Sequence, residues 1–250
     1  MGSLKTPRDI SLLQLNKEEI LVIACDSAGG IGQKTYDQIK VSNQIVGQYT
    51  VKVPLMEVMS VGAEVISVID NLGVEYEPTG REIITGIKKN LKLLGKTELL
   101  NGSTEENVKT LQTALGVTVI AKVKLAKLKQ YQSSNLNNII VAAGLPLVGE
   151  KLLAAKSKAV DFKKFLQLKK LNYLDQILPV GSKGILHELN ILAAENNLDF
   201  KLKKSKHKFE LDLEKSAGPA TVLLLSLDQK YLAKLKSEIE LPITEIAKFK

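Results

Sequence analysis

The stretch Cys25–Lys34, CDSAGGIGQK, follows the apolar run Glu19–Ala24, EILVIA. A nearly continuous apolar run of this length predicts a buried strand, and Asp26 stands at its end. An acid at a strand end can hold a metal ion that accompanies phosphate. Asp, Ser and Gly are also ordinary turn residues. The stretch therefore predicts either a nucleotide-binding turn or a plain turn.

Three glycines, Gly29, Gly30 and Gly32, are compatible with the first alternative, although turn chemistry favours the plain turn when this stretch is taken alone. Glycine permits positive φ and a close approach of the backbone to a ligand. Their backbone N–H groups can form a nest for phosphate, with Lys34 as a charge partner. The spacing matches neither the P-loop nor the dinucleotide fingerprint.

Helices and strands alternate outward from this stretch. Apolar spacing and capping residues predict helices at 44–61, 79–94 and 149–155, and two more capped by Ser182 and Asp228. The helix at 79–94 opens with a Thr79–Glu82 capping box, and Pro54 kinks or starts the first helix. Apolar runs predict strands at 64–70, 115–123, 139–143 and 221–227. Residues 124–138 are polar and weakly patterned, so the chain is expected to be α+β in two halves, 1–135 and 136–250.

The composition is that of an ordinary globular protein, with 44% hydrophobic and 25% charged residues. A single cysteine among 250 residues excludes an internal disulfide and favours a cytoplasmic location. The net charge of +8 comes from clustered lysines, which usually form solvated surface, and an anionic small ligand is the alternative. Aromatics make up 4% of the chain and tryptophan is absent. Stacking platforms for nucleic acid are therefore scarce. We expect neither a nucleic-acid partner nor a membrane partner.

Acids in three segments suggest a magnesium–ATP site. They are Asp26, Glu57 among apolar neighbours, and the pair Glu105–Glu106. Magnesium sites for nucleotides use one or two carboxylates plus phosphate oxygens. A carboxylate embedded among apolar residues needs a partner or a metal. The alternative for Glu57 is an exposed position or a pair with Lys52.

The order of the segments resembles the aminoimidazole ribonucleotide synthetase (PurM-like) superfamily. CDSAGGIGQK resembles its first Asp-Gly segment, VGQYTVKVPLMEVMSVGAEV its acid-bearing helix, and NGSTEENVKTLQTALGVTVIAKV its Gly-Gly-acid-Thr segment. NNIIVAAGLPLVG, VGSKGILHELNILAAENN and SAGPATVLLLSL resemble segments of its carboxy-terminal domain. The sequence of these segments looks most like the small ATP-binding proteins of the superfamily, some of which are α-ribazole kinases.

The resemblance implies a two-domain fold in which amino-terminal βα domains pair their sheets into a shared β-barrel in a homodimer. The carboxy-terminal domain would be an α/β sandwich on the acceptor side. ATP and Mg²⁺ would be the cofactors, with Asp26, Glu57, Glu105 and Glu106 as metal ligands. Ser103, Thr104 and Asn107 would join the glycines and Lys34 at the nucleotide.

The expected activity is transfer of the ATP γ-phosphoryl group to a hydroxyl of a nucleoside-like acceptor, with α-ribazole first. The acceptor is expected near LPVGSKG at 178–184. Phosphoryl transfer needs mainly positioning and charge neutralisation. A base could come from Asp37, Asp70 or Glu75, and the spacing does not choose among them.

Two alternatives stay open. Ser27 and Ser103 stand where thiamine-monophosphate kinases carry acids. One alternative is an enzyme of that kinase class, which acts on a phosphorylated metabolite. The other is a non-catalytic nucleotide-binding protein of the same fold, because fold alone does not establish function.

Overall fold

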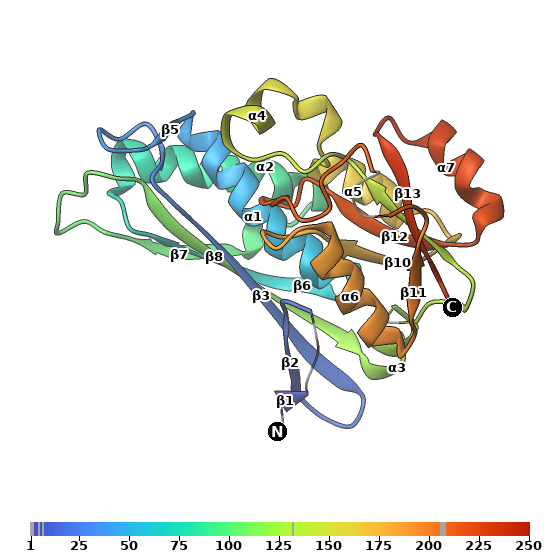
Figure 1. Cartoon of the computed structure of the whole chain (residues 1–250). Helices are drawn as coiled ribbons and strands as arrows, with labels where there is room; N and C mark the ends of the chain where they lie inside the picture. Colours follow the sequence, from blue (N-terminus) through green and yellow to red (C-terminus); the bar gives the residue numbers. More distant parts are fainter. Residues whose placement is uncertain (1–2, 5, 7, 132, 206–208) are drawn as a thin grey trace. The chain divides into compact units, whose positions relative to one another are not determined.

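The computed structural model describes residues 3–4, 6, 8–131, 133–205 and 209–250 (Figure 1). The chain is α+β and divides into two compact units. The first comprises residues 1–4, 10–59 and 63–123, and the second 5–9, 60–62 and 124–250. The functional domains assigned to 1–135 and 136–250 stay predictions. Within the described residues no helix is both long and apolar enough to cross a bilayer.

The first unit is built on a six-stranded sheet in the order β1-β2-β3-β8-β6-β7. The strands are β1 Ser3–Leu4, β2 Ser11–Gln14, β3 Glu19–Gly29, β8 Ala114–Lys124, β6 Glu64–Leu72 and β7 Leu100–Thr104. Strands β6 and β7 are parallel, whereas β6 and β8 are antiparallel. Two short strands, β4 Ile31–Gly32 and β5 Ile39–Lys40, pair beside this sheet.

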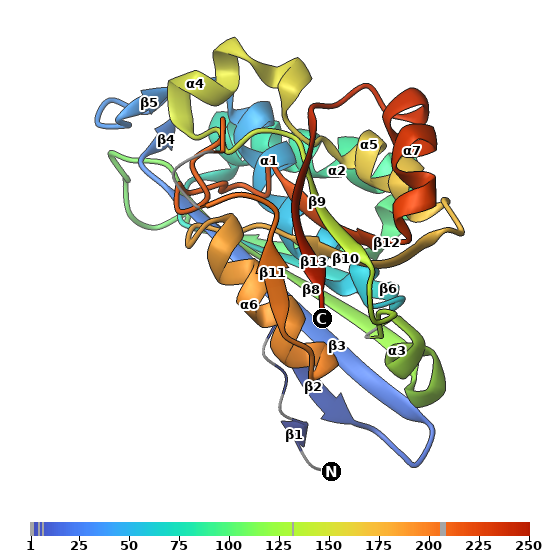
Figure 2. The same ribbon diagram turned by 45° about the vertical axis from the view of Figure 1, so that its right-hand side comes forward.

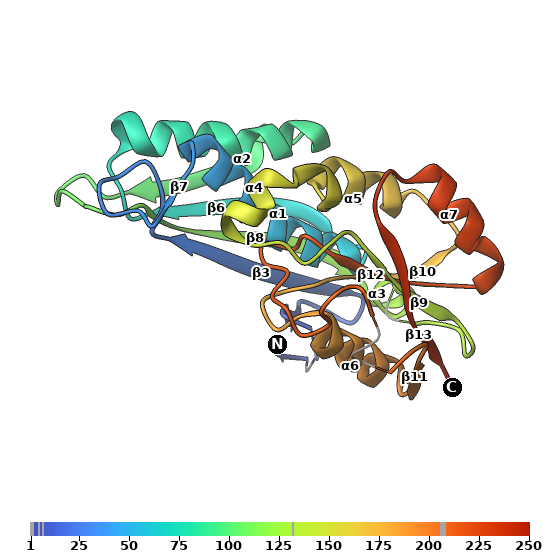
Figure 3. The ribbon, with the colours of Figure 1, turned by 45° about the horizontal axis from the view of Figure 1, so that its top comes forward.

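Helices α1 (Asn43–Ser60) and α2 (Arg81–Leu94) cover one face of this sheet (Figure 3). Their backbones touch, because a Cβ on Gly47 would lie 2.1 Å from the Ile83 carbonyl oxygen. A Cβ on Gly86 would lie 2.0 Å from the Gln44 carbonyl oxygen. Two glycines thus set how closely the helices pack against each other.

Local details differ from the sequence-based expectations for these helices. Helix α1 continues through Pro54, so the proline does not mark its start. The capping box is wrong: Thr79 Oγ1 donates to Glu75 Oε1 (2.5 Å), and Glu82 Oε2 accepts from Asn43 Nδ2 (2.9 Å). Glu75, four residues before Thr79, and Asn43 of α1 replace the partners that the capping box requires.

The second unit contains an antiparallel five-stranded sheet in the order β10-β12-β9-β13-β11. Its strands are β10 Leu174–Pro179, β12 Leu223–Leu227, β9 Ile139–Ala143, β13 Ile243–Phe249 and β11 Phe200–Leu202. Helix α6 (Ile185–Asn196) lies on one face, and α5 (Phe162–Lys169) and α7 (Leu232–Glu238) on the other (Figure 2). The short helices are α3 Leu125–Tyr131 and α4 Gly149–Ala154.

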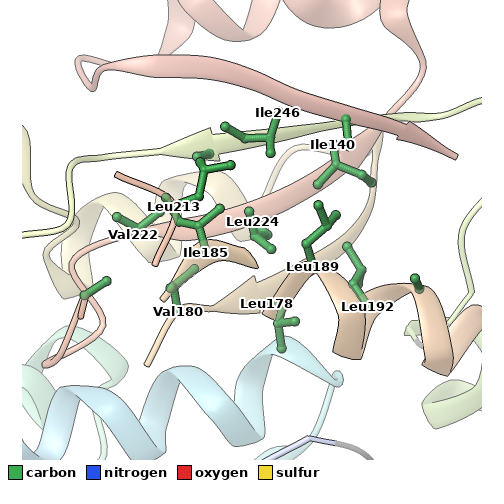
Figure 4. Close-up of a cluster of buried hydrophobic side chains, with 14 of the residues drawn as sticks. Ile140, Leu178, Val180, Ile185, Leu189, Leu192, Leu213, Val222, Leu224 and Ile246 are labelled. Carbon is green, nitrogen blue, oxygen red and sulfur yellow. The ribbon is translucent and has the colours of Figure 1, made fainter. Parts of the chain in front are cut away.

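Helix α6 packs its apolar stripe on this sheet (Figure 4). Ile185, Leu189 and Leu192 recur at helical spacing and are all 0% exposed. The helix begins after Gly184 without a side-chain cap, so the predicted Ser182 cap is wrong. The predicted Asp228 cap is confirmed, since its side chain accepts from Lys230 N at a 3₁₀ turn before α7.

Candidate functional site

Asp26 lies within β3, which continues through it to Gly29 instead of ending in a turn. Burial raises the pKa of the Asp26 carboxyl to about 6, although a hydrogen bond from the Ser27 backbone and the charge of Lys52 oppose the rise. Lys52, on α1, is only 2% exposed, and its ammonium lies 4.8 Å from the ring centre of Tyr49. A desolvated carboxylate of this kind gains from a nearby cation.

The glycine-rich segment turns after Gly29. Gly30 has a φ of +69°, and its N–H donates to the Thr113 carbonyl (2.8 Å). A Cβ on Gly32 would lie 2.4 Å from Thr113 Oγ1 and 2.8 Å from Asp37 Oδ2. A Cβ on Gly29 would meet nothing within 4 Å. The positive φ therefore accounts for Gly30 and close packing accounts for Gly32, whereas Gly29 has open space beside it.

Asp37 stabilises this loop through side-chain hydrogen bonds. Its Oδ2 accepts from the Lys34 N–H (2.8 Å) and from Thr113 Oγ1 (2.7 Å), and its Oδ1 accepts from the Thr113 N–H (2.7 Å). The side chain is 4% exposed. Three donors hold this carboxylate, so Asp37 has a structural role in fixing the loop.

Lys34 reaches across to Glu75. Its Nζ lies 2.6 Å from Glu75 Oε2 and 3.0 Å from the Thr110 carbonyl oxygen. Burial would raise the pKa of Glu75, but hydrogen bonds from Lys34 and Thr79 outweigh it and hold the pKa below its ordinary value. The predicted phosphate partner and one predicted base thus neutralise each other.

Glu57 lies inside α1 and is 9% exposed, between Met56 and Val58 at 0%. The alternative of an exposed surface glutamate is therefore wrong.

The other predicted acids organise a loop. Glu105 Oε1 accepts from the N–H groups of Asn107 (2.8 Å) and Val108 (3.1 Å).

Glu106 belongs to the same loop. Its Oε1 accepts from the Tyr76 N–H (2.8 Å) and from Thr104 Oγ1 (2.7 Å). Among the described residues no group of three or more His, Cys, Asp or Glu side chains could hold a metal ion. The four predicted ligands are thus not gathered into a preformed centre. Asp26 is desolvated, whereas Glu105 and Glu106 each accept two hydrogen bonds on Oε1. Metal binding by these four acids stays a prediction.

Asp70 faces a cavity of about 290 Å³ between α2 and strands β6 and β7. The lining includes Asp70, Tyr76, Lys88, Asn101, Ser103 and Thr104. Burial raises the pKa of Asp70 to about 6, and the charge of Lys88 opposes the rise. The predicted residues Asp70, Ser103 and Thr104 therefore come together here. We call this cavity the Asp70 pocket.

The Asp70 pocket is separate from Asp26. Gly116 of β8 lies beside Asp26 and pairs with Asn71 of β6, so two strand spacings, roughly 10 Å, lie between the strands that carry Asp26 and Asp70.

The sequence-based predictions missed Glu188 of α6, which is 8% exposed. Burial and the negative charge of Asp9 raise its pKa to about 7, against a backbone hydrogen bond from Gly181 and the charges of Lys183 and Arg8. It thus lies against the segment LPVGSKG, where the acceptor was expected. Glu188 lies inside the apolar stretch ILHELNIL, just as Glu57 lies among apolar residues, so the same sequence pattern could have identified it as a buried acid.

Known proteins match this chain through their structures. No family model matches the sequence, and no curated protein matches it. Thiamine-monophosphate kinase from Aquifex aeolicus superposes with a TM-score of 0.63 at 12% identity over 97% of this chain and 88% of that one. The enzyme from Stenotrophomonas maltophilia gives 0.62 at 17% identity over 99% and 88%.

Phosphoribosylformylglycinamidine synthase II from Thermotoga maritima also matches. The TM-score is 0.57 at 14% identity, over 98% of this chain and 38% of the synthase. These matches run along nearly the whole chain and include both sheets. The chain has the PurM-like, AIR-synthase-related fold.

Proposed function

We propose that this protein is an ATP-dependent phosphotransferase that acts on a small phosphorylated metabolite, in the manner of thiamine-monophosphate kinases. The observation that carries the proposal is the match to AaThiL complexed with AMPPCP and TMP. It covers 98% of this chain and 85% of that one with a TM-score of 0.61. Asp26 adds a desolvated carboxylate at the glycine-rich segment.

Phosphoryl transfer to a phosphate requires few catalytic side chains. A phosphate acceptor is already ionised, so transfer to it requires no base, and positioning with charge neutralisation is sufficient. Magnesium would supply charge neutralisation and would arrive with the nucleotide, next to Asp26 and Glu57. Gly29, the glycine with open space, would present its backbone to the phosphates, with Ser103, Thr104 and Asn107 as further nucleotide contacts.

The acceptor is revised from the sequence-based expectation. α-Ribazole gains no support from any sequence match, and the thiamine-monophosphate kinases favour a phosphorylated acceptor. Should the acceptor be a hydroxyl, Asp70 is the best base among Asp37, Asp70 and Glu75, because the other two carboxylates are held by hydrogen bonds. On the acceptor side, near 178–184, Glu188 could take up a proton.

A non-catalytic nucleotide-binding role is the second candidate. The Lys34–Glu75 ion pair favours this second role, because Glu75 binds the ammonium group that was expected to contact the nucleotide phosphates. The experiment is to incubate the protein with ATP, magnesium and either thiamine monophosphate or α-ribazole, and to detect phosphorylated product by mass spectrometry. D26N should abolish turnover, and D199N, at an exposed site, should not. ATP binding without any product would support the non-catalytic role instead.

A homodimer completes the proposal. The face of the first sheet opposite α1 and α2 carries the partly exposed Leu21, Ile23, Ile69 and Ile120, with Ile66 39% exposed. Pairing this face with that of a second copy would bury it and produce the expected barrel.

A further inference from the structure

Two lysines of the second unit share one aromatic ring. The ammonium groups of Lys127, on α3, and Lys169, at the end of α5, lie over the ring of Tyr131, 5.9 Å and 5.3 Å from its centre. The ring packs on the backbone at Gly62, where a Cβ would lie 2.4 Å from Tyr131 Cδ2. Cation–π attraction favours each ammonium group at the ring, yet the two positive charges repel each other.

The charged form of Lys169 is destabilised in this position. Burial, and after it the positive charge of Lys127, lowers the pKa of the Lys169 ammonium group to about 8. A negative charge beside the two lysines would offset both effects, because an opposite charge favours the protonated amine. The lysine cluster is therefore suited to an anion.

A cavity of about 550 Å³ adjoins this cluster. Tyr131 and Lys169 line it together with a further lysine, Lys170. The other polar residues of the described lining are Gln130, Ser133, Ser134, Asn135, Asn172 and Asp175. Ligand sites for small molecules span roughly 300–1,000 Å³, so this cavity, which we call the Lys169 pocket, has room for a small metabolite.

The one carboxylate in the described lining is held by protein contacts. Asp175 Oδ2 accepts from Asn135 Nδ2 (2.6 Å) and from Asn138 Nδ2 (2.7 Å). Asp175 thus fixes the loop that precedes β9. Because Lys169 and Lys170 outnumber it, the described lining keeps a net positive charge.

We propose that the Lys169 pocket binds the phosphate group of a small phosphate monoester through Lys169 and Lys170, with Lys127 adding its charge. A phosphate monoester gathers up to two negative charges on one group, and lysines bind such a group as point charges. The site lies outside the proposed phosphotransferase reaction. Leu174 of the lining begins β10, and the expected acceptor segment 178–184 lies at the other end of that strand, roughly 14–17 Å away.

The test titrates the intact protein, without ATP, with glycerol 3-phosphate and follows its backbone amide signals by NMR. Glycerol and succinate serve as the uncharged and the dicarboxylate probes. Glycerol 3-phosphate should bind more tightly than either and should move the signals of Ser133 and Asn172. K169Q should weaken this binding about tenfold, which corresponds to about 1.4 kcal/mol. K127Q should weaken it less, because the exposed charge of Lys127 is more strongly screened.

The matched control is K163Q, which removes an exposed lysine of α5 that does not line the pocket. It should leave the affinity for glycerol 3-phosphate unchanged. Equal weakening by K163Q and K169Q would indicate general attraction to the positive surface and would overturn the proposal. Signals that move at Gly181 and not at Ser133 would place the anion in the acceptor segment and would also overturn it. The proposal fails as well if succinate or glycerol binds as tightly as glycerol 3-phosphate, or if no probe moves the signals of Ser133 and Asn172.

Discussion

Lys34 and Glu75 form an ion pair across 41 residues of sequence, with Nζ 2.6 Å from Oε2. The side chains are 13% and 32% exposed. The pair joins the glycine-rich segment to the residues before α2, and it decides whether Lys34 is available to a nucleotide.

The first prediction separates the two roles of Lys34. E75Q frees the ammonium, so ATP should bind more tightly if Lys34 contacts phosphate, and K34A should weaken binding. Each change should cost about 1 kcal/mol of stability or less, because the pair is partly solvated. Calorimetric titration measures the affinity, with E77Q in the exposed Glu77–Arg81 pair as the control. Unchanged ATP affinity in both variants would make the pair purely structural.

The second prediction concerns Asp37. D37A removes an acceptor of three hydrogen bonds and leaves the buried Thr113 hydroxyl and N–H without it. The free energy of unfolding should fall by about 2–4 kcal/mol, since unsatisfied buried donors cost about 1–3 kcal/mol each. Urea unfolding measures the loss. A variant that keeps full stability but loses turnover would instead mark Asp37 as a base.

Only part of this site could be predicted from sequence. The apolar run at Glu19 predicts β3, since a buried strand has a local signature. Strand β7 was missed because it is an edge strand whose residues are mostly exposed, so no apolar alternation exists. The role of Asp37 depends on Thr113, 76 positions away, and no local pattern contains that partner.

The fold was recognisable for a different reason. Six weak segments in a fixed order carry information that single motifs lack, and the structure agrees with that order over nearly the whole chain. The roles of the acidic residues were harder to predict, because they depend on how deeply each carboxylate is buried and on which hydrogen-bond donors surround it. Glu105 and Glu106 are predicted as metal ligands from sequence, and in the structure Oε1 of each accepts a hydrogen bond from a backbone N–H group that the sequence does not reveal.

The third prediction is a pH dependence caused by Asp70. Its folded-state pKa of about 6 lies above the unfolded value of about 3.9. The stability due to the protonated form is fully present below about pH 4 and is lost as the pH rises through about 6. D70N cannot ionise, so at about pH 8 it should exceed the wild type by on the order of 2 kcal/mol.

Urea unfolding at about pH 4 and about pH 8 measures this difference. D199N, at an exposed aspartate, should follow the wild type at both values. A stabilising D70N would indicate that the buried carboxylate is kept at a cost in stability, as binding sites often are. A destabilising D70N at the higher pH would contradict the assigned burial cost.

The fourth prediction concerns Arg8 in the second unit. Its Nε and Nη2 lie 2.8 Å and 2.7 Å from Glu195 Oε1 and Oε2, and the side chains are 0% and 4% exposed. R8A would leave the glutamate buried without this partner and should cost about 3–5 kcal/mol of stability. R8M/E195L, which removes both charges, should recover part of that loss. An additive double variant would mean that the pair contributes no coupling energy.

The last prediction tests the dimer through the face opposite α1 and α2. Ile66, 39% exposed, and the partly exposed Ile120 lie on this face. An apolar sheet face in a homodimer is buried at the two-fold axis, where each substitution acts twice. We therefore expect a dimer at micromolar concentration in light scattering, and a monomer for I120E, because an isolated buried carboxylate is costly. T85E, at an exposed position of α2 on the other side of the sheet, should remain a dimer. A monomeric wild type would remove the dimer from the proposal, and an I120E variant that stays dimeric would place the interface elsewhere.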